Sequence, residues 1–179
     1  MDTDRELILR CLEQEVAAQN QFYRRYASKM FGICLRYAGN AMEAEDILQD
    51  GFIRIYRSLH HFRFEGSLEG WVRRIIVNTA INHQKKNMKL KYEVELTEIN
   101  LHATLSEDAV SNLSKEELLR IIHSLPAGYR TVFNLYVIEG YNHKEIGALL
   151  GVSENTSKTQ LMRARLSIQE TLKKLEVKQ

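Results

Sequence analysis

The feature that most limits how this chain can fold is a glycine between two short amphipathic segments near the carboxyl end. The stretch NHKEIGALLGVSENTSKTQLMRARL, residues 142–166, opens with Asn142 and Glu145, whose spacing is that of a capping box at a helix start. Gly151 stands where a left-handed residue would end that helix, and Ser153 can cap a second one. This spacing predicts a helix-turn-helix, whose second helix offers its first residues to the major groove of DNA.

The second of these helices carries side chains that are suited to contacting DNA. Those near its start can reach base edges, whereas guanidinium groups a turn or more later are better placed for phosphates. The base-reaching candidates are Asn155, Thr156, Lys158, Thr159 and Gln160, and the phosphate candidates are Arg163 and Arg165. An ordinary helical hairpin with a solvated outer face is the alternative interpretation of the same pattern.

Composition predicts helices for the rest of the chain as well. Its 179 residues include one proline and nine glycines, while leucine, glutamate, lysine, arginine, alanine and glutamine are plentiful. We therefore expect an all-α protein, and its length allows one large or two small domains. The expected helices span residues 4–13, 15–37, 41–59, 67–88, 115–124, 127–138, 143–150 and 154–174. Capping-box patterns at Thr3–Glu6, Asn40–Glu43 and Ser114–Glu117 mark three of their starts.

A stretch without helical periodicity divides the chain. Residues 91–112 show neither sustained periodicity nor hairpin turns, so we expect a flexible linker there. It would join a first small helical domain, residues 1–90, to a second one, residues 113–179, that holds the helix-turn-helix. Within the linker, YEVELTEI at residues 92–99 alternates like a strand, but a lone strand has nothing to pair with.

Charge is segregated along the chain, although the formal net charge is only +2. Residues 67–91 hold six basic side chains against one acid, whereas residues 92–117 hold seven acids against one lysine. A basic binding face beside an acidic connector produces such a pattern. Solvated helix faces also generate charge runs, so the pattern alone does not decide between the two.

The basic segment also carries side chains of the kind that bind unpaired bases. Aromatic rings stack on bases, and amide and guanidinium groups form hydrogen bonds with them. The candidates are Phe62 and Phe64 before a glycine-containing loop, and then Trp71, Arg73, Arg74, Asn78, Asn82, Lys85 and Lys86 on a helix. Trp71 by itself is explained equally well as a core residue near a helix start.

Nothing in the sequence predicts catalysis, a metal or a cofactor. Asp46, Gln49 and Asp50 share one helix face, but no clustered histidine or glycine-rich phosphate loop accompanies them, and surface solvation explains these side chains. Cys11 and Cys34 lack ligand spacing, so we expect packed, reduced thiols. The acidic start lacks a signal-peptide pattern and no apolar run suits a membrane helix, which predicts a cytoplasmic protein without membrane insertion.

Three motifs in a fixed order carry a resemblance to a known family. They are AEDILQDGFIRIYRSL at 44–59, FRFEGSLEGWVRRIIVNTAINHQKK at 62–86 and LPAGYRTVFNLYVIEGYNHKEIGALLGVSENTSKTQLMRAR at 125–165. The chain resembles bacterial sigma factors of the extracytoplasmic-function (ECF) group over nearly its whole length. The resemblance implies sigma regions 2 and 4 and a non-enzymatic function, in which the protein binds core RNA polymerase and directs promoter-specific initiation at -35 and -10 elements.

The resemblance also implies roles for residues and a set of partners. Asp46, Gln49, Asp50 and Phe52 match the helix that docks on the coiled coil of the beta-prime subunit. The loop from Phe62 to Gly66, which includes Arg63, and the helix from Trp71 to Lys86 match the surface that melts the -10 element and captures an extruded base. Residues 153–165, with Arg130, match the reader of the -35 element. The implied partners are core RNA polymerase through its beta-prime and beta subunits, promoter DNA and an anti-sigma factor.

Four positions depart from commoner family patterns. Asn82 stands where many members have Asp, Gly147 where Ala is usual, and Asn155 and Ser157 where Gly and Val are frequent. An amide at position 82 is easily accommodated because it both donates and accepts hydrogen bonds. We expect Asn155 and Ser157 in or beside the recognition face, so these two changes bear on base preference.

Two other functions are compatible with parts of the sequence. A stand-alone helix-turn-helix regulator would bind a palindrome as a dimer, and its first half would not need the basic aromatic segment at 62–86. A helical adaptor that binds only protein would leave Lys158, Arg163 and Arg165 without a purpose.

Overall fold

The structure is a computed structural model, and it describes residues 3–89 and 114–176. The predicted linker at 91–112, with its alternative strand, lies outside the described residues. Every regular element among the residues described is a helix, as composition predicts. The chain divides into two compact units, residues 1–83 and 84–179.

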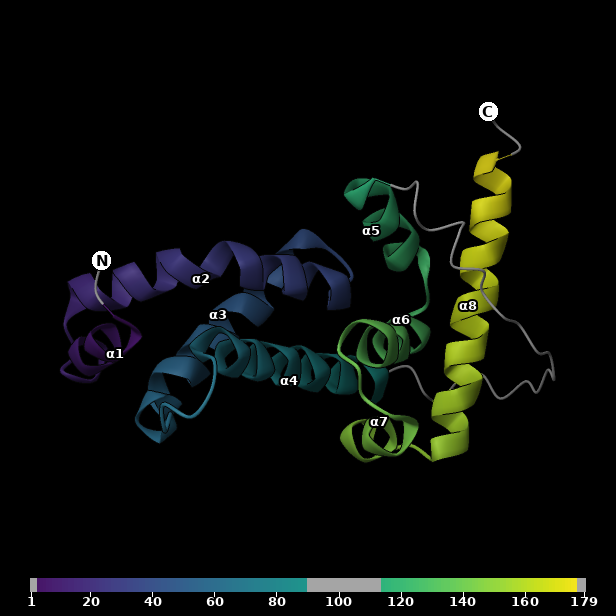
Figure 1. Cartoon of the computed structure of the whole chain (residues 1–179). Coiled ribbons are helices and arrows are strands. Elements are labelled where there is room, and N and C mark those ends of the chain that lie inside the picture. The colour runs from purple at the N-terminus through teal and green to yellow at the C-terminus, as the bar shows by residue number, and fades with distance from the viewer. Residues whose placement is uncertain (1–2, 90–113, 177–179) are drawn as a thin grey trace. The chain divides into compact units, whose positions relative to one another are not determined.

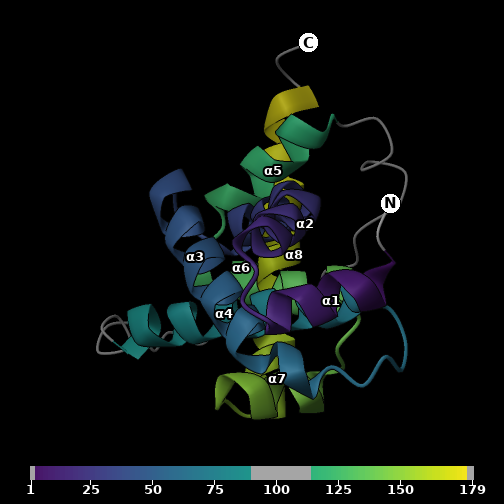
Figure 2. The same cartoon turned by 90° about the vertical axis from the view of Figure 1, so that its left-hand side faces the viewer.

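The first unit is a bundle built on two long helices that pack against each other. α1 lies against α2, and α2 lies against α3 (Figures 1 and 2). A short 3-10 turn then leads through a loop to α4, which continues past residue 83. The elements are α1 (Asp4–Leu12), α2 (Val16–Tyr37), α3 (Ala41–Ser58), η1 (Leu59–His61) and α4 (Leu68–Lys89).

The predicted caps at the helix starts of this unit are present. Thr3 and Glu6 form a complete capping box, in which each accepts a hydrogen bond from the other's backbone N–H. Asn40 Oδ1 accepts from the Glu43 N–H at 2.8 Å, but the Glu43 carboxylate accepts from Gly39 instead of closing the box on Asn40. Each such cap stabilises its helix by about 1 kcal/mol.

The core of the first unit is apolar and rich in aromatic rings. Phe22 lies 5.0 Å from Tyr26 and 6.5 Å from Phe52 between ring centroids. Cys11 and Cys34 are buried free thiols, which confirms the prediction of packed cysteines. Burial raises the pKa of Cys34 to about 12, because the thiolate would lose its hydration.

In the second unit, three shorter helices pack against one long helix. Figure 1 shows α5, α6 and α7 along one side of α8, and all three contact it. A complete capping box between Ser114 and Glu117 begins α5, as the sequence predicts. The elements are α5 (Lys115–Ser124), α6 (Ala127–Phe133), the π-helical turn η3 (Asn134–Ile138), α7 (His143–Leu150) and α8 (Glu154–Glu176).

The predicted helix bounds agree with the structure except around residue 134. Elsewhere the predicted and observed helix ends differ by at most two residues. The largest difference is at α8, which was expected to end at residue 174 and ends at Glu176. The single helix expected at 127–138 instead widens at Asn134 into η3, where the Glu139 N–H donates to the Asn134 carbonyl, five residues back. An apolar periodicity cannot reveal one extra residue per turn.

None of the described helices combines the length and the apolar character that crossing a bilayer requires.

Candidate nucleic-acid interface

The exposed side of α3 mixes carboxylates with an apolar side chain. Asp46, Gln49, Asp50 and Ile53 follow one another at helical spacing and are all exposed, Ile53 to 48%. We call these four residues the docking face. Asp50 Oδ2 lies 3.1 Å from Nε2 of His83, so a histidine of α4 contacts one carboxylate of the docking face. An exposed apolar group beside charges is typical of a protein-binding surface.

Phe52 does not belong to this exposed face, although the resemblance includes it. Its side chain is 4% exposed, and its ring lies 4.6 Å from that of Tyr23 and 6.2 Å from that of Tyr56. This corrects the expectation for Phe52 as a contact residue. Its ring supports α3 from inside, and the helical repeat that exposes Asp46 and Asp50 turns position 52 toward α2.

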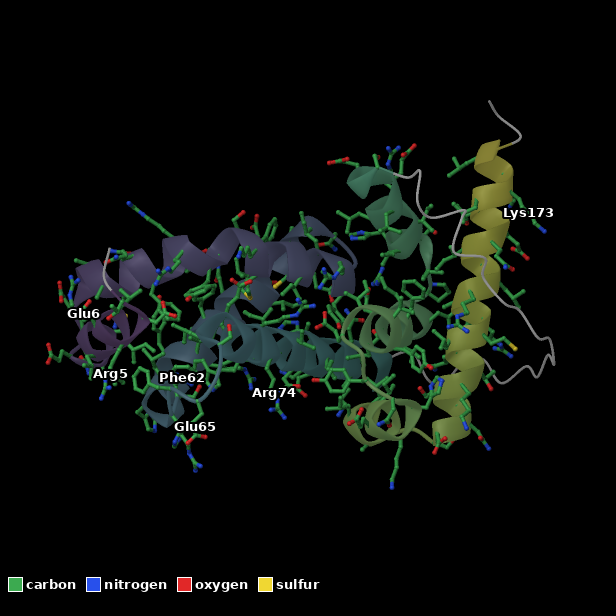
Figure 3. The ribbon with its side chains drawn as sticks, in the orientation of Figure 1. Arg5, Glu6, Phe62, Glu65, Arg74 and Lys173 are labelled. Atoms are coloured by element: carbon green, nitrogen blue, oxygen red, sulfur yellow. The ribbon has the colours of Figure 1, made fainter. Side chains whose placement is uncertain are left out.

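A cluster of aromatic rings in edge-to-face and tilted contact supports the loop between η1 and α4. Phe62 is 8% exposed and lies 5.2 Å from Phe64 and 5.4 Å from Trp71 between ring centroids (Figure 3). Phe64 is 43% exposed and has φ of 59°, a conformation that costs a non-glycine residue about 1–3 kcal/mol. Trp71 is half-buried, so it belongs to this aromatic cluster and still exposes part of its ring.

One side of α4 continues this surface. Trp71, Arg74, Asn78, Asn82 and Lys85 recur at three- and four-residue spacing, and each is at least partly exposed. Arg63 in the loop and Lys86 beside this row are exposed. We call the loop 62–67 together with this side of α4 the aromatic-basic surface.

Arg73 lies roughly on the opposite side of α4 from that row. It is two residues from Trp71, so it points away from the row. It shares its side of the helix with Ile76 and Ala80, which are fully buried. The sequence prediction grouped Arg73 with the other basic residues because it lies among them in the chain. Arg73 is half-buried, so its place in the -10 surface stays a prediction.

The predicted helix-turn-helix is present, and backbone hydrogen bonds close its turn. Gly151 has φ of 74°, and the N–H groups of Gly151 and Val152 both donate to the Gly147 carbonyl, at 2.8 and 3.1 Å. This is the left-handed helix ending predicted for Gly151. Ser153 Oγ then accepts from the Thr156 N–H at 3.0 Å and caps α8.

The turn passes so close to α7 that position 147 has no room for a side chain. A Cβ atom built on Gly147 would lie 2.8 Å from the carbonyl oxygen of Val152 and 3.6 Å from the backbone nitrogen of Glu154. The neighbouring atoms are backbone, which cannot move aside without shifting the turn. The glycine at this position therefore allows the close approach of the turn to α7.

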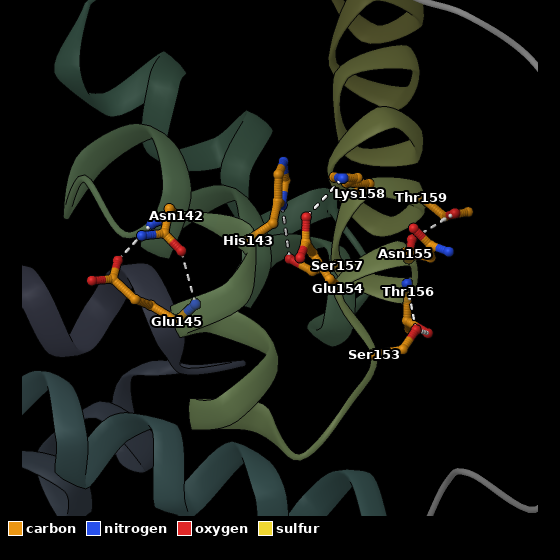
Figure 4. A network of polar contacts seen from close by, with 10 residues as sticks. All are labelled: Asn142, His143, Glu145, Ser153, Glu154, Asn155, Thr156, Ser157, Lys158 and Thr159. Atoms are coloured by element: carbon orange, nitrogen blue, oxygen red, sulfur yellow. Dashed lines mark hydrogen bonds and ion pairs between the residues drawn. The ribbon is translucent and has the colours of Figure 1, made fainter.

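Ser157 lies between the two helices and not on the outer face. It is fully buried, and its Oγ lies 3.0 Å from Nδ1 of His143 at the start of α7 (Figure 4). The other side of the His143 ring stacks on Tyr136, with centroids 4.5 Å apart. This corrects the expectation that Ser157 borders the recognition face, so only Asn155 of the two departures can bear directly on base preference.

The environment of His143 favours its neutral form. Burial is the main cause of a lowered pKa, and the positive charges of Lys158 and Arg165 act in the same direction, while Glu154 opposes them. His143 was assigned no role from the sequence, because fourteen residues separate it from Ser157 and no short motif joins them.

Asn155, Lys158 and Thr159 form the exposed outer face of α8 near its start, and we call them the reader face. Lys158 Nζ forms an ion pair with Glu154 at 2.7 Å, and the bond lowers the pKa of the Glu154 carboxyl. The Thr159 hydroxyl donates to the Asn155 carbonyl (Figure 4). Lys158 is thus the charged group of this face, and it already has a partner within the chain.

The remaining candidates on α8 lie closer to the core. Thr156 is half-buried, and its hydroxyl bonds that of Ser153, 2.8 Å away. Arg163 donates to the Tyr129 hydroxyl at 3.1 Å, which ties α8 to α6. Gln160 and Arg165 are half-buried.

Arg130 is part of the interior of the second unit. Its side chain is 6% exposed, and its guanidinium donates to the His123 carbonyl at 3.2 Å. The resemblance implied a DNA contact for this residue, and its burial corrects that expectation. A guanidinium that joins α6 to the end of α5 stabilises the unit that carries the reader face.

Comparison with known proteins accounts for both units. Residues 22–89 match the family model for sigma-70 region 2, and residues 115–179 match that for sigma-70 region 4. The ECF RNA polymerase sigma factor SigW of Bacillus subtilis is 34% identical over 161 residues, which cover 84% of this chain and 86% of SigW. The chain is an ECF sigma factor of the sigma-70 family.

Other relatives agree with this assignment. The ECF RNA polymerase sigma-E factor of Haemophilus influenzae is 28% identical over 97% of each chain. A co-crystal structure of the sigma factor RpoE with the anti-sigma factor NepR from Bartonella quintana matches the fold with a TM-score of 0.50 at 19% identity, over 86% of this chain and 96% of that one.

As an ECF sigma factor, the protein directs promoter-specific initiation of transcription with RNA polymerase and is not an enzyme. Family membership over both units excludes a stand-alone regulator and a protein-only adaptor as its principal function.

Proposed function

We propose that the docking face of α3 binds the coiled coil of the polymerase beta-prime subunit. The exposed strip of Asp46, Gln49, Asp50 and Ile53 carries this proposal, because its carboxylates can pair with basic groups while Ile53 adds apolar contact. The contact that His83 makes with Asp50 fixes one carboxylate before docking, which reduces the side-chain entropy lost on binding.

We further propose that the aromatic-basic surface captures the non-template strand at the -10 element. Extruding a base costs a few kcal/mol, and stacking on Trp71 or Phe64 with hydrogen bonds from Asn78 or Asn82 offsets this cost. Lys85, Lys86 and Arg74 supply positive charge along the same side of α4 for the strand's phosphates.

The reader face is proposed to recognise the -35 element. Asn155, Lys158 and Thr159 are exposed in the first turns of α8, where a helix in the major groove meets base edges. A chain with a net charge of +2 binds DNA weakly alone, because few phosphate contacts release few counterions. Polymerase holds both DNA-binding surfaces together, which converts two weak contacts into one strong one.

Regulation by an anti-sigma factor, within the cytoplasm, completes the proposal. The related RpoE structure is a complex with such a partner. Tyr23, Met42 and Ile53 are exposed apolar side chains on α2 and α3, and they give a protein partner a surface that overlaps the docking face.

Charge reversal on α3 tests the docking face. Asp50→Arg should abolish binding to core polymerase and run-off transcription, because it places a cation against the basic partner surface. His83→Ala removes the contact to Asp50 but keeps the carboxylate, and Glu13→Arg reverses an exposed charge just after α1, so both should keep most of the binding. Normal core affinity for Asp50→Arg would reject the assignment, with Trp71 fluorescence as the check on folding.

Alanine substitution on α8 tests the reader face. Lys158→Ala should weaken occupancy of a promoter mapped by run-off transcription, whereas Lys173→Ala, also exposed on α8, should not. Equal occupancy for the two variants would reject the proposed role of Lys158.

A further inference from the structure

Arg5 of α1 lies over a ring of the aromatic-basic surface. Its guanidinium carbon is 5.4 Å from the ring centroid of Phe64, the most exposed aromatic of the loop (Figure 3). Figure 3 shows Arg5 at the same end of the first unit as Phe62 and Glu65, and α1 contacts η1 just before the loop. A helix that the -10 assignment does not include therefore reaches the proposed strand-binding surface.

Three carboxylates of this region are engaged elsewhere, whereas Glu65 is exposed in the loop itself, next to Phe64. Asp4 pairs with Arg25 at 2.8 Å, Glu69 pairs with Lys29 at 2.8 Å, and Glu6 closes the capping box on Thr3. Among the described residues, Arg5 makes no ion pair, and its contact is with the Phe64 ring. The charge of its guanidinium is thus not taken up by an ion pair with any described residue.

A guanidinium on an aromatic face is well prepared to bind a phosphate. The ring holds the guanidinium flat through a cation–π contact, which leaves its edge N–H groups directed outward. Those N–H groups can form paired hydrogen bonds with phosphate oxygens. Arg63 adds a second exposed guanidinium in the same loop.

We propose that Arg5 binds a backbone phosphate of the unpaired non-template strand as the strand passes the loop at residues 62–67. Arg5 thereby extends the aromatic-basic surface onto α1, and the strand's path continues beyond the captured base. The inference rests on the proposed -10 role of this surface and adds to it a contact from a different helix.

The test uses holoenzyme assembled on a promoter fork with an unpaired -10 strand, its sequence taken from mapped start sites. Arg5→Ala should weaken binding and reduce the salt slope of log K by about 0.7, the value for one phosphate contact in single-stranded DNA. Arg5→Lys should keep the slope, because the charge remains. Arg24→Ala, an exposed arginine on α2, serves as the matched control and should behave as wild type.

Neutral methylphosphonate links, placed one at a time in the unpaired strand, locate the contact. At the contacted phosphate, Arg5→Ala should cause no further loss of binding, whereas at the other positions its effect should persist. If Arg5→Ala matches Arg24→Ala while Trp71→Ala still weakens fork binding, the inference is wrong and the proposed -10 surface stands. If Trp71→Ala is also without effect, the proposed surface itself is wrong.

Discussion

A cluster of aromatic rings lies beneath the aromatic-basic surface of the first unit, whereas a hydrogen bond between His143 and Ser157 lies beneath the reader face of the second. The first kind of support is apolar and does not titrate. The second is a polar contact between two helices, and burial lowers the pKa of its histidine, which gains a positive charge in acid. The comparison teaches that two proposed DNA-binding surfaces in one chain can differ in how firmly they are held and in what disturbs them.

Removing the central ring of the aromatic support should have the largest effect. Phe62→Ala leaves a cavity between Phe64 and Trp71 and should destabilise the first unit by about 3–5 kcal/mol. Trp71 is the single tryptophan of the chain, so its fluorescence during urea unfolding reports this unit alone. If the free energy of unfolding falls by less than about 1 kcal/mol, the aromatic cluster is not what supports the loop. The proposed contrast between apolar and polar support would then be wrong for the first unit.

Adding a side chain at position 147, where the turn passes close to α7, should have an intermediate effect. Gly147→Ala forces a Cβ atom against the Val152 carbonyl and should cost about 1–3 kcal/mol, because backbone must shift. Faster amide exchange in α7 and a weakened reader face should accompany the loss. Ala148→Gly, at an exposed neighbouring position, separates this clash from ordinary helix propensity. Unchanged amide exchange in α7 of Gly147→Ala would show that the turn accommodates the added methyl group at little cost.

Acid should weaken the second unit more than the first, with the smallest effect of the three. The pKa of His143 is lowered on folding, so the unfolded chain binds its proton more readily. Its contribution to stability is fully present above the ordinary pKa of about 6.5 and is lost as pH falls below that value. His143→Gln should flatten the pH dependence of amide exchange in α7, and His123→Gln should not. If exchange depends on pH equally in the two variants, His143 is not the group that makes the second unit sensitive to acid.

Local features were predictable from the sequence because they depend on neighbours in the chain. The caps at Thr3, Ser114 and Ser153 and the left-handed Gly151 require only residues within a few positions. The positions of helix starts and ends follow from such groups, which is why the predicted bounds are close.

The wrong expectations share a different cause. Phe52, Arg130 and Ser157 were given outer positions, and all three are buried. Whether a side chain faces outward depends on which side of its helix meets another helix, and a motif match does not contain that information. The contacts from His83 to Asp50 and from Arg5 to Phe64 join residues far apart in the chain, so no local pattern could reveal them.

The ion pair between Lys158 and Glu154 has a consequence for how a promoter is told from other DNA. When a phosphate or base takes Lys158, the carboxylate of Glu154 loses its partner at the edge of a polyanion. A cytosine amino group can donate to that carboxylate, whereas a base edge with only acceptors repels it. In the proposed reader face, Glu154 would thus favour a sequence that offers a hydrogen-bond donor beside Lys158 over one that offers only acceptors.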